Sequence, residues 1–205
     1  MTERHPGEQI SPLSEALPEI LPGERIILRL LDLEDVAELH LLVLDNLDHL
    51  MILAFIAKEP MTLADRQILV AGWADDHRRG LGADMGIWLN DTLVGMVGIH
   101  RRGPDDASME IGYWLDEQSE GLGFATEATQ VLCEEAFAHP EVEVVRIRAD
   151  LSNDRSRATA ERAGFRWVGT EPTPTAQRTL TGTNVQSVFE IHCHEFDDQW
   201  RSRFV

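Results

Sequence analysis

A strand, a helix and a second strand that follow one another within residues 107–150 constrain the fold more than any other feature of this sequence. Residues 107–115, ASMEIGYWL, alternate with the two-residue period of a strand. A helix is predicted over about residues 123–139, where Pro140 ends it, and the β-branched segment 142–150, VEVVRIRAD, is predicted to be the second strand. Because a crossover helix joins strands that run in parallel, the chain is predicted to have an α/β fold.

The segments on either side extend this unit into a mixed sheet of about seven strands flanked by helices. Capping signals begin two of the helices, because Asp32 is followed by Asp35 and Thr62 by Asp65. Residues 90–91, Asn-Asp, mark the turn of a hairpin. The other predicted elements are strands at 24–30, 84–90, 92–100, 165–171 and 185–195, helical segments between 32 and 60, and helices at 62–80 and 155–163.

Length and proline content indicate the domain organisation. A chain of 205 residues and 23.1 kDa is the size of one domain with one core. Residues 1–22 contain four of the nine prolines and little periodic apolar pattern, so we expect an extended or partly ordered N-terminal leader. Residues 23–205 are expected to form the single folded domain.

Composition excludes several classes of protein. The sequence has no run of about 18 apolar residues and no apolar stretch of a signal peptide, so we expect a cytoplasmic protein without a membrane partner. Cys133 and Cys193 are too few for a disulfide framework or a four-ligand zinc site. His192 and His194 flank Cys193 on a predicted strand, but two histidines without a placed carboxylate are a weak signal, and no metal is predicted.

The charge balance is strongly acidic, with 36 acidic and 18 basic side chains, a net charge of -18 and a pI of about 4.7. The negative electrostatic field of such a surface disfavours binding to nucleic acid. Lys58 is the only lysine, and the acidic residues are scattered along the chain. We interpret the surface as adapted to a salt-rich solvent, in which ions screen the repulsion between carboxylates. An acidic groove for a cationic substrate is the alternative interpretation.

A glycine-rich segment after the strand 107–115 is the strongest signal for a binding site. In residues 120–126, EGLGFAT, Gly121 and Gly123 allow backbone N–H groups to approach an anion, and the positive end of the helix dipole favours a phosphate there. The third glycine of a Rossmann fingerprint and the G-K-[ST] of a Walker loop are both missing. A tight strand-to-helix turn without a ligand is the alternative interpretation.

Three segments together resemble the GNAT acetyltransferase superfamily, namely EIGYWL at 110–115, EGLGFATEA at 120–128 and LSNDRSRATAERAGFRWVG at 151–169. The nearest branch is that of the RimJ/RimL-type ribosomal-protein N-acetyltransferases. The resemblance implies a GNAT fold with a mixed, mostly antiparallel central sheet, and acetyl-CoA as cosubstrate without a metal. It also implies that the coenzyme contacts Leu115, Glu120, Gly121, Leu122, Gly123, Phe124, Ala125, Thr126, Asn153 and Ser156.

The sequence departs from the family pattern at positions that bear on coenzyme binding. Glu120 stands where the family has Gln or Arg, and Leu122 where the branch often has a basic or polar residue. The turn is therefore expected to hold the pyrophosphate through its backbone. Arg155, Arg157 and Arg162 on the next helix are candidates to supply charge toward the phosphates, with exposed, ion-paired arginines as the alternative.

Amine attack on a thioester requires a neutral amine, a donor for the oxyanion and a proton for the departing thiolate. Glu110 is the candidate base, since it lies just before the segment that faces the cofactor cleft in the family. A water relay and a merely solvated carboxylate are the alternatives. In the branch a glutamate precedes the glycine that matches Gly169, but this sequence has Val168 there.

The candidate acid is Ser156, which resembles the serine that branch members place near the coenzyme sulfur. Many superfamily members use a tyrosine on this helix, but the single tyrosine here, Tyr113, lies on an earlier strand. Asn153 is expected near the pantetheine arm, and helix capping is the alternative role for Asn153 and Ser156. Backbone N–H groups near Leu115 and Asp116 are the expected oxyanion donors.

Together these features predict an acetyl-CoA-dependent N-acetyltransferase that works by direct attack in a ternary complex. The expected acceptor is the N-terminal α-amine of a protein. A small amine, such as an aminoglycoside or a polyamine, is one alternative, and a non-catalytic acyl-CoA-binding regulatory module is another. Superfamily members commonly pair through their later strands, so a homodimer is one possible assembly, and the sequence leaves the oligomeric state open.

Overall fold

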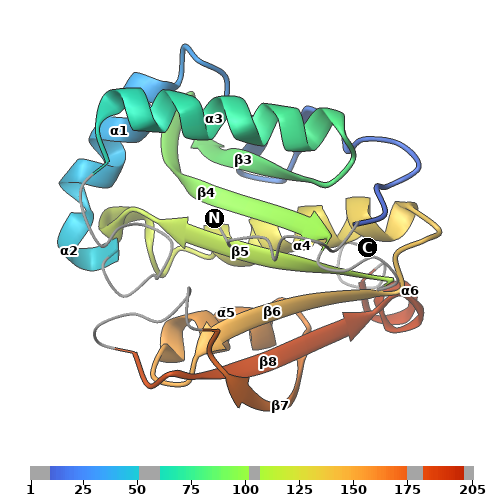
Figure 1. Cartoon of the computed structure of the whole chain (residues 1–205). Coiled ribbons are helices and arrows are strands. Elements are labelled where there is room, and N and C mark those ends of the chain that lie inside the picture. The colour runs from blue at the N-terminus through green and yellow to red at the C-terminus, as the bar shows by residue number, and fades with distance from the viewer. Residues whose placement is uncertain (1–9, 51–60, 102–106, 175–181, 201–205) are drawn as a thin grey trace.

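Residues 10–50, 61–101, 107–174 and 182–200 of a computed structural model are described here, and they form a central sheet with helices on both faces (Figure 1). The strands are β1 (Ile20–Pro22), β2 (Ile27–Leu30), β3 (Gly82–Leu89), β4 (Thr92–Arg101), β5 (Ser108–Leu115), β6 (Val144–Asp150), β7 (Arg166–Pro172) and β8 (Val185–His192). The helices are α1 (Val36–Asp45), α2 (Leu47–Leu50), α3 (Leu63–Arg78), the 3-10 turn η1 (Glu117–Ser119), α4 (Phe124–Ala138), α5 (Asp154–Arg162) and α6 (Cys193–Trp200).

The sheet has eight strands in the order β1-β2-β3-β4-β5-β6-β8-β7. Its neighbours are antiparallel except for β5 and β6, which α4 joins in parallel. The predicted α/β fold with a mixed, mostly antiparallel sheet is confirmed. The short strand β1, which lies in the segment expected to be a leader, is the one added to the predicted seven.

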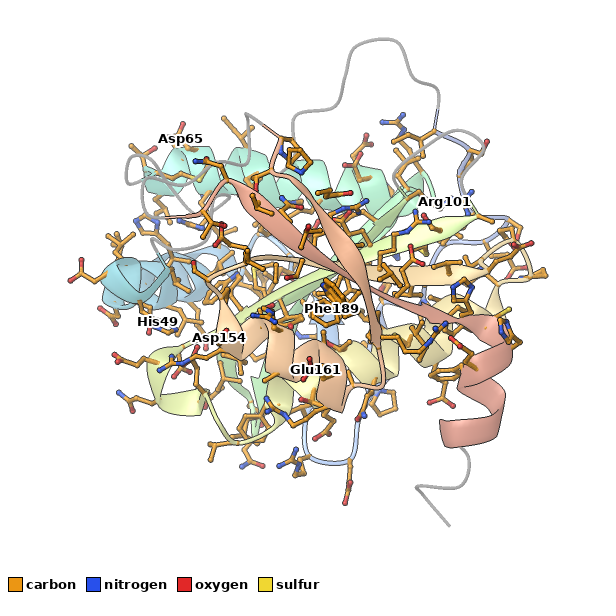
Figure 2. All side chains as sticks on the ribbon, turned by 90° about the horizontal axis from the view of Figure 1, so that it is seen from below. His49, Asp65, Arg101, Asp154, Glu161 and Phe189 are labelled. Carbon is orange, nitrogen blue, oxygen red and sulfur yellow. The ribbon has the colours of Figure 1, made fainter. Side chains whose placement is uncertain are left out.

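Two apolar cores lie on the two faces of the sheet. α4 and α5 cover one face, where Leu132 and the β5 residue Ile111 are buried. α1 and α3 cover part of the other face, where Val70 and Trp114 are buried. Figure 2 shows α3 on one side of the sheet and α4 and α5 on the other, with Asp154 marking the start of α5. Successive β5 residues therefore point to different helical layers, as the strand period requires.

Local signals set several boundaries as predicted. Thr62 and Asp65 exchange the hydrogen bonds of a capping box at the start of α3. Asn90 and Asp91 have φ angles of 48° and 63° in the turn between β3 and β4. These left-handed values match the type I′ turn that the right-handed twist of a two-residue hairpin favours.

Among the boundaries that differ from the predictions, two bear on the argument. The helix predicted after Asp32 begins at Val36, because residues 33–35 form a turn before it. The predicted Asp32–Asp35 pair is formed in this turn: the Asp35 N–H donates to the Asp32 carboxylate at 3.3 Å and the Asp32 N–H to the Asp35 carboxylate at 3.0 Å. The strand predicted to run to residue 195 ends at His192, where α6 follows directly. Side-chain alternation therefore does not apply to residues 192–194. Residues 51–60, part of the predicted helical segments, lie outside the described residues.

The N-terminal segment packs on the α4 face of the sheet. Leu13, Leu17 and Leu21 are buried in that core, and the Leu13 N–H donates to the carbonyl of Gly80 at 2.8 Å. The division of the chain at residue 22 stays a prediction. No helix within the described ranges is long and apolar enough to cross a membrane.

Candidate active site

The parallel strands β5 and β6 separate halfway along their length. They pair from Ser108 with Val144 to Ile111 with Ile147, and the register records no pair beyond that point. Figure 1 shows the two ribbons together at one end and diverging toward α2 and α5. We call the unpaired stretch, residues 112–115 of β5 and 148–150 of β6, the β5/β6 split.

Backbone donors of β5 point into this split. The N–H of Asp116 donates to the Val94 carbonyl on β4 at 2.9 Å. Because N–H groups of an antiparallel ladder alternate between its two sides, those of Tyr113 and Leu115 point away from β4, toward β6. The expected pair of oxyanion donors is therefore corrected. Leu115 has its N–H on the split, whereas the Asp116 N–H is engaged elsewhere.

The glycine turn leads from η1 into α4. Gly121 and Gly123 have φ angles of 73° and 88°, a left-handed region that glycine adopts without strain. No side chain caps α4, and the first N–H groups of any helix lack partners within it. The turn and the first residues of α4 therefore present backbone donors and the positive end of a helix dipole, which is the chemistry of an anion site.

Arg25, just before β2, holds this turn from a distant part of the sequence. Its Nη1 donates to the Leu122 carbonyl at 2.8 Å and its Nε to the Glu127 carboxylate at 2.8 Å. Glu127 in turn accepts from the N–H groups of Arg25 and Ile26 at 2.7 and 3.3 Å. The guanidinium also lies 5.0 Å from the centre of the Phe124 ring. We call these contacts the Arg25 clamp.

Glu120, at the start of the turn, connects the turn to helices α2 and α5. Its carboxylate lies 2.9 Å from Nε2 of His49 of α2 and forms an ion pair with Arg155 of α5. Figure 2 places His49 and Asp154, the residue before Arg155, at the same end of the molecule. The carboxylate that departs from the family pattern therefore holds an arginine beside the glycine turn.

On α5, Asn153 is the N-cap, and its Oδ1 accepts from the Ser156 N–H at 3.0 Å. Asn153 therefore caps α5, and its place near the pantetheine arm stays a prediction. The hydroxyl of Ser156 lies 3.0 Å from the hydroxyl of Tyr113, which also donates to the Ser156 carbonyl at 2.9 Å. Burial raises the pKa of Tyr113 to about 12, although hydrogen bonds from the Ser156 and Thr159 side chains act to lower it.

Glu110 lies on the opposite face of β5. Its carboxylate is paired with Arg148 of β6, whose guanidinium also binds Glu171 of β7. Burial acts to lower the pKa of Arg148, but the two carboxylates outweigh burial and raise it above its usual value. Glu110 is therefore held by Arg148 beside the point where β5 and β6 separate, and it is not simply solvated.

The structure brings the predicted residues to this region from three directions. The glycine turn lies at the far end of β5, Ser156 approaches from the α4 and α5 side, and Glu110 from the other face. Sequence reasoning missed Arg25, Arg148, the contact of His49 with Glu120 and the role of Tyr113. In each case the partner lies at least 23 residues away in the chain, so no local spacing could have revealed the contact.

Comparison with known proteins identifies the class and then the family. The sheet with its split and glycine turn fits an acyltransferase. Residues 25–166 match the model of the acetyltransferase (GNAT) domain, and this chain belongs to the GNAT acetyltransferase family. The predicted GNAT fold and enzyme class are thereby confirmed.

The relatives agree with the RimJ/RimL-type resemblance. The chain is 33% identical over 145 residues to "Putative ribosomal N-acetyltransferase YdaF" of Bacillus subtilis, which covers 70% of this chain and 79% of the relative. It is 34% identical over 89 residues to the ribosomal-protein-serine acetyltransferase of Escherichia coli, covering 43% and 50% of the two chains. The solved structure of RimL, a ribosomal α-N-protein acetyltransferase in complex with coenzyme A, has a TM-score of 0.76 at 24% identity, over 86% of this chain and 99% of that one.

Proposed function

We propose that this enzyme transfers the acetyl group of acetyl-CoA to the N-terminal α-amine of a protein. The observation that carries the proposal is the β5/β6 split with the glycine turn and the N-terminus of α4 at its open end. An elongated thioester with a diphosphate fits this arrangement, because its anionic part meets backbone donors while its acyl end lies between the strands. The names of the curated relatives support the ribosomal-protein type of acceptor.

The residues that hold the coenzyme in this proposal fall into two groups. The diphosphate is held by backbone N–H groups of the turn and of the first residues of α4, that is Gly121, Leu122, Gly123, Phe124, Ala125 and Thr126. Arg155, held by Glu120, adds the positive charge that the turn itself lacks. Leu115, Asn153 and Ser156 border the path of the pantetheine arm.

Three groups of the chain serve the transfer. The amine nitrogen attacks the thioester carbon, and the N–H of Leu115 donates to the developing oxyanion. The carbon–sulfur bond then breaks with its electron pair on sulfur, and the hydroxyl of Ser156 donates a hydrogen bond to this thiolate. The amine proton passes to the Glu110 carboxylate, directly or through water. This assignment places the base and the thiolate donor on opposite faces of β5.

A positively charged acceptor suits the surface near the glycine turn. A hollow of about 390 Å³ lies where α1 meets α2, and Asp45, Asp48 and Glu117 are among its lining residues. These carboxylates attract a protonated amine toward the site. At neutral pH about a tenth of α-amines are already neutral, so the base has a mild task.

The test measures release of the coenzyme thiol from acetyl-CoA at high salt. The acceptors are peptides with free Ser, Ala or Met at the N-terminus, the same peptides with a capped N-terminus, spermidine and an aminoglycoside. We expect turnover with the free peptides and none with the capped ones. Turnover confined to the small amines contradicts the protein acceptor, and coenzyme binding without turnover on any amine contradicts an enzymatic role.

The base is tested by Glu110→Gln, with Glu190→Gln as the matched control. Glu190 pairs with Arg146 at 2.6 Å on the same open face of the sheet. We expect Glu110→Gln to lower kcat by about 10²-fold, with the loss smaller at high pH, where more amine is neutral. Equal rates for the two variants would show that Glu110 only anchors Arg148.

A further inference from the structure

The single tyrosine of the chain lies against the serine that the proposed mechanism uses. Tyr113 extends from β5 at the split, and its hydroxyl reaches two oxygens of one residue on α5. These are the Ser156 carbonyl, at 2.9 Å, and the Ser156 hydroxyl, at 3.0 Å. The sequence places these residues 43 positions apart, so the contact follows from the fold and not from a local turn.

Counting protons shows that this geometry has two arrangements. The carbonyl oxygen can only accept, and the phenol carries one proton. When Tyr113 donates to the carbonyl, the Ser156 hydroxyl donates to the phenol oxygen, and its proton is directed inward. When Tyr113 donates to the serine oxygen instead, the Ser156 proton is free for another acceptor. The carbonyl still has the helical partner that a residue four positions later provides.

We propose that Tyr113 is a positioning residue that controls the direction of the Ser156 hydroxyl. This inference rests on the proposed function, in which Ser156 donates to the departing thiolate. Tyr113 holds the serine proton inward in the free enzyme. As negative charge develops on sulfur, Ser156 turns its proton outward, and the phenol shifts its own proton from the Ser156 carbonyl to the serine oxygen. The Ser156 oxygen thus keeps a hydrogen-bond partner and the Ser156 hydroxyl keeps a proton to donate. No proton leaves the Tyr113–Ser156 pair.

The environment of Tyr113 fits this role. Burial keeps the phenol protonated at all physiological pH values, so it acts as a hydrogen-bond donor and not as an acid. Thr159, one turn after Ser156, is buried beside it and accepts from Arg162 at 3.2 Å. The hydroxyl contact therefore lies within a packed layer between β5 and α5, which limits the directions that the Ser156 side chain can adopt.

A double-mutant cycle on kcat tests the proposal. The variants are Tyr113→Phe, Ser156→Ala and the pair, with Ser152→Ala as control, because the Ser152 hydroxyl binds Asp150 on the exposed turn before α5. We expect Tyr113→Phe to lower kcat about tenfold with little change in KM, and to have no further effect when Ser156 is already Ala. An equal loss in both backgrounds, or a change in KM alone, overturns the proposal.

A second measurement does not depend on activity. Because Tyr113 is the only tyrosine, labelling tyrosine with ¹³C at Cζ gives one NMR signal. We expect this signal to move in Ser156→Ala, and to move on addition of coenzyme A in the natural protein but not in that variant. A signal unaffected by Ser156→Ala overturns the contact itself. A responsive signal in a protein that acetylates no amine contradicts the proposed function while the Tyr113–Ser156 coupling stands.

Discussion

The Arg25 clamp gives the most direct way to separate the geometry of the glycine turn from its sequence. Arg25→Met keeps much of the side-chain volume and removes every polar contact of the guanidinium. It deletes the hydrogen bonds to the Leu122 carbonyl and the Glu127 carboxylate and the contact with the Phe124 ring. The Glu127 carboxylate still accepts from the backbone N–H groups of Arg25 and Ile26, so the substitution leaves no buried charge without a partner.

The size of the effect follows from exposure. The side chain of Arg25 is 47% exposed and that of Glu127 is 11% exposed, so the charge-assisted bonds belong at the lower end of their range. With a small cation–π term, the loss amounts to about 2 kcal/mol. For a domain of this size that corresponds to a fall in Tm of about 4–8 °C. Because the turn must then be ordered by its ligand, we expect coenzyme A to bind about fivefold more weakly.

Thermal unfolding and isothermal titration with coenzyme A measure the two effects. The matched control is Arg79→Met, because Arg79 is 56% exposed and lies 3.8 Å from the carboxylates of Asp75 and Asp76 on the surface of α3. Such pairs contribute almost nothing to stability. If Arg25→Met melts and binds coenzyme A as Arg79→Met does, the clamp does not order the turn and the reasoning is wrong.

Three further expectations follow from the charges. Glu120→Gln removes the carboxylate that holds Arg155 beside the glycine turn, so coenzyme A should bind two- to fivefold more weakly in a titration; tighter binding would mean that the carboxylate only repels the phosphates. Burial acts to raise the pKa of Asp35, but hydrogen bonds from Arg29 and the Asp32 backbone lower it, so its contribution to stability is present above about pH 4 and lost as pH falls below that. In Asp35→Asn the free energy of unfolding should therefore depend less on pH in this range. A pH dependence equal to that of the natural protein contradicts this expectation. The net charge of -18 predicts a Tm that rises with molar salt, and a Tm independent of salt contradicts that.

The parts of the fold that sequence predicts well are those set by near neighbours. The hairpin follows from Asn90 and Asp91, and the start of α3 from Thr62 and Asp65, because each signal acts over four residues or fewer. The parallel pairing of β5 with β6 follows from chain connectivity alone. Helix α4 spans Phe124–Ala138, within the range 123–139 that the sequence predicts.

The end of β8 shows why other boundaries are not local. The alternation His-Cys-His reads as a strand, yet α6 begins at Cys193. Two contacts favour the helix. The Glu195 carboxylate accepts from the His192 N–H at 3.2 Å, and the Phe196 ring lies 5.1 Å from that of Phe137 on α4. The second contact joins segments that no sequence window spans, and it buries an aromatic ring that a continuing strand would place elsewhere.

The candidate site likewise combines local sequence patterns with contacts between residues that are distant in the chain. The glycine turn and the Asn153–Ser156 motif are local patterns, and the sequence indicates both. What positions them is not local, because Arg25 reaches the turn across 97 residues and Arg155 reaches Glu120 across 35. This explains the departure at Glu120. The turn carries a carboxylate where the family has Gln or Arg, but that carboxylate holds Arg155, so a cation from α5 stands beside the glycine turn. In the proposed coenzyme site the positive charge therefore comes from another element, which the sequence of the turn alone does not show.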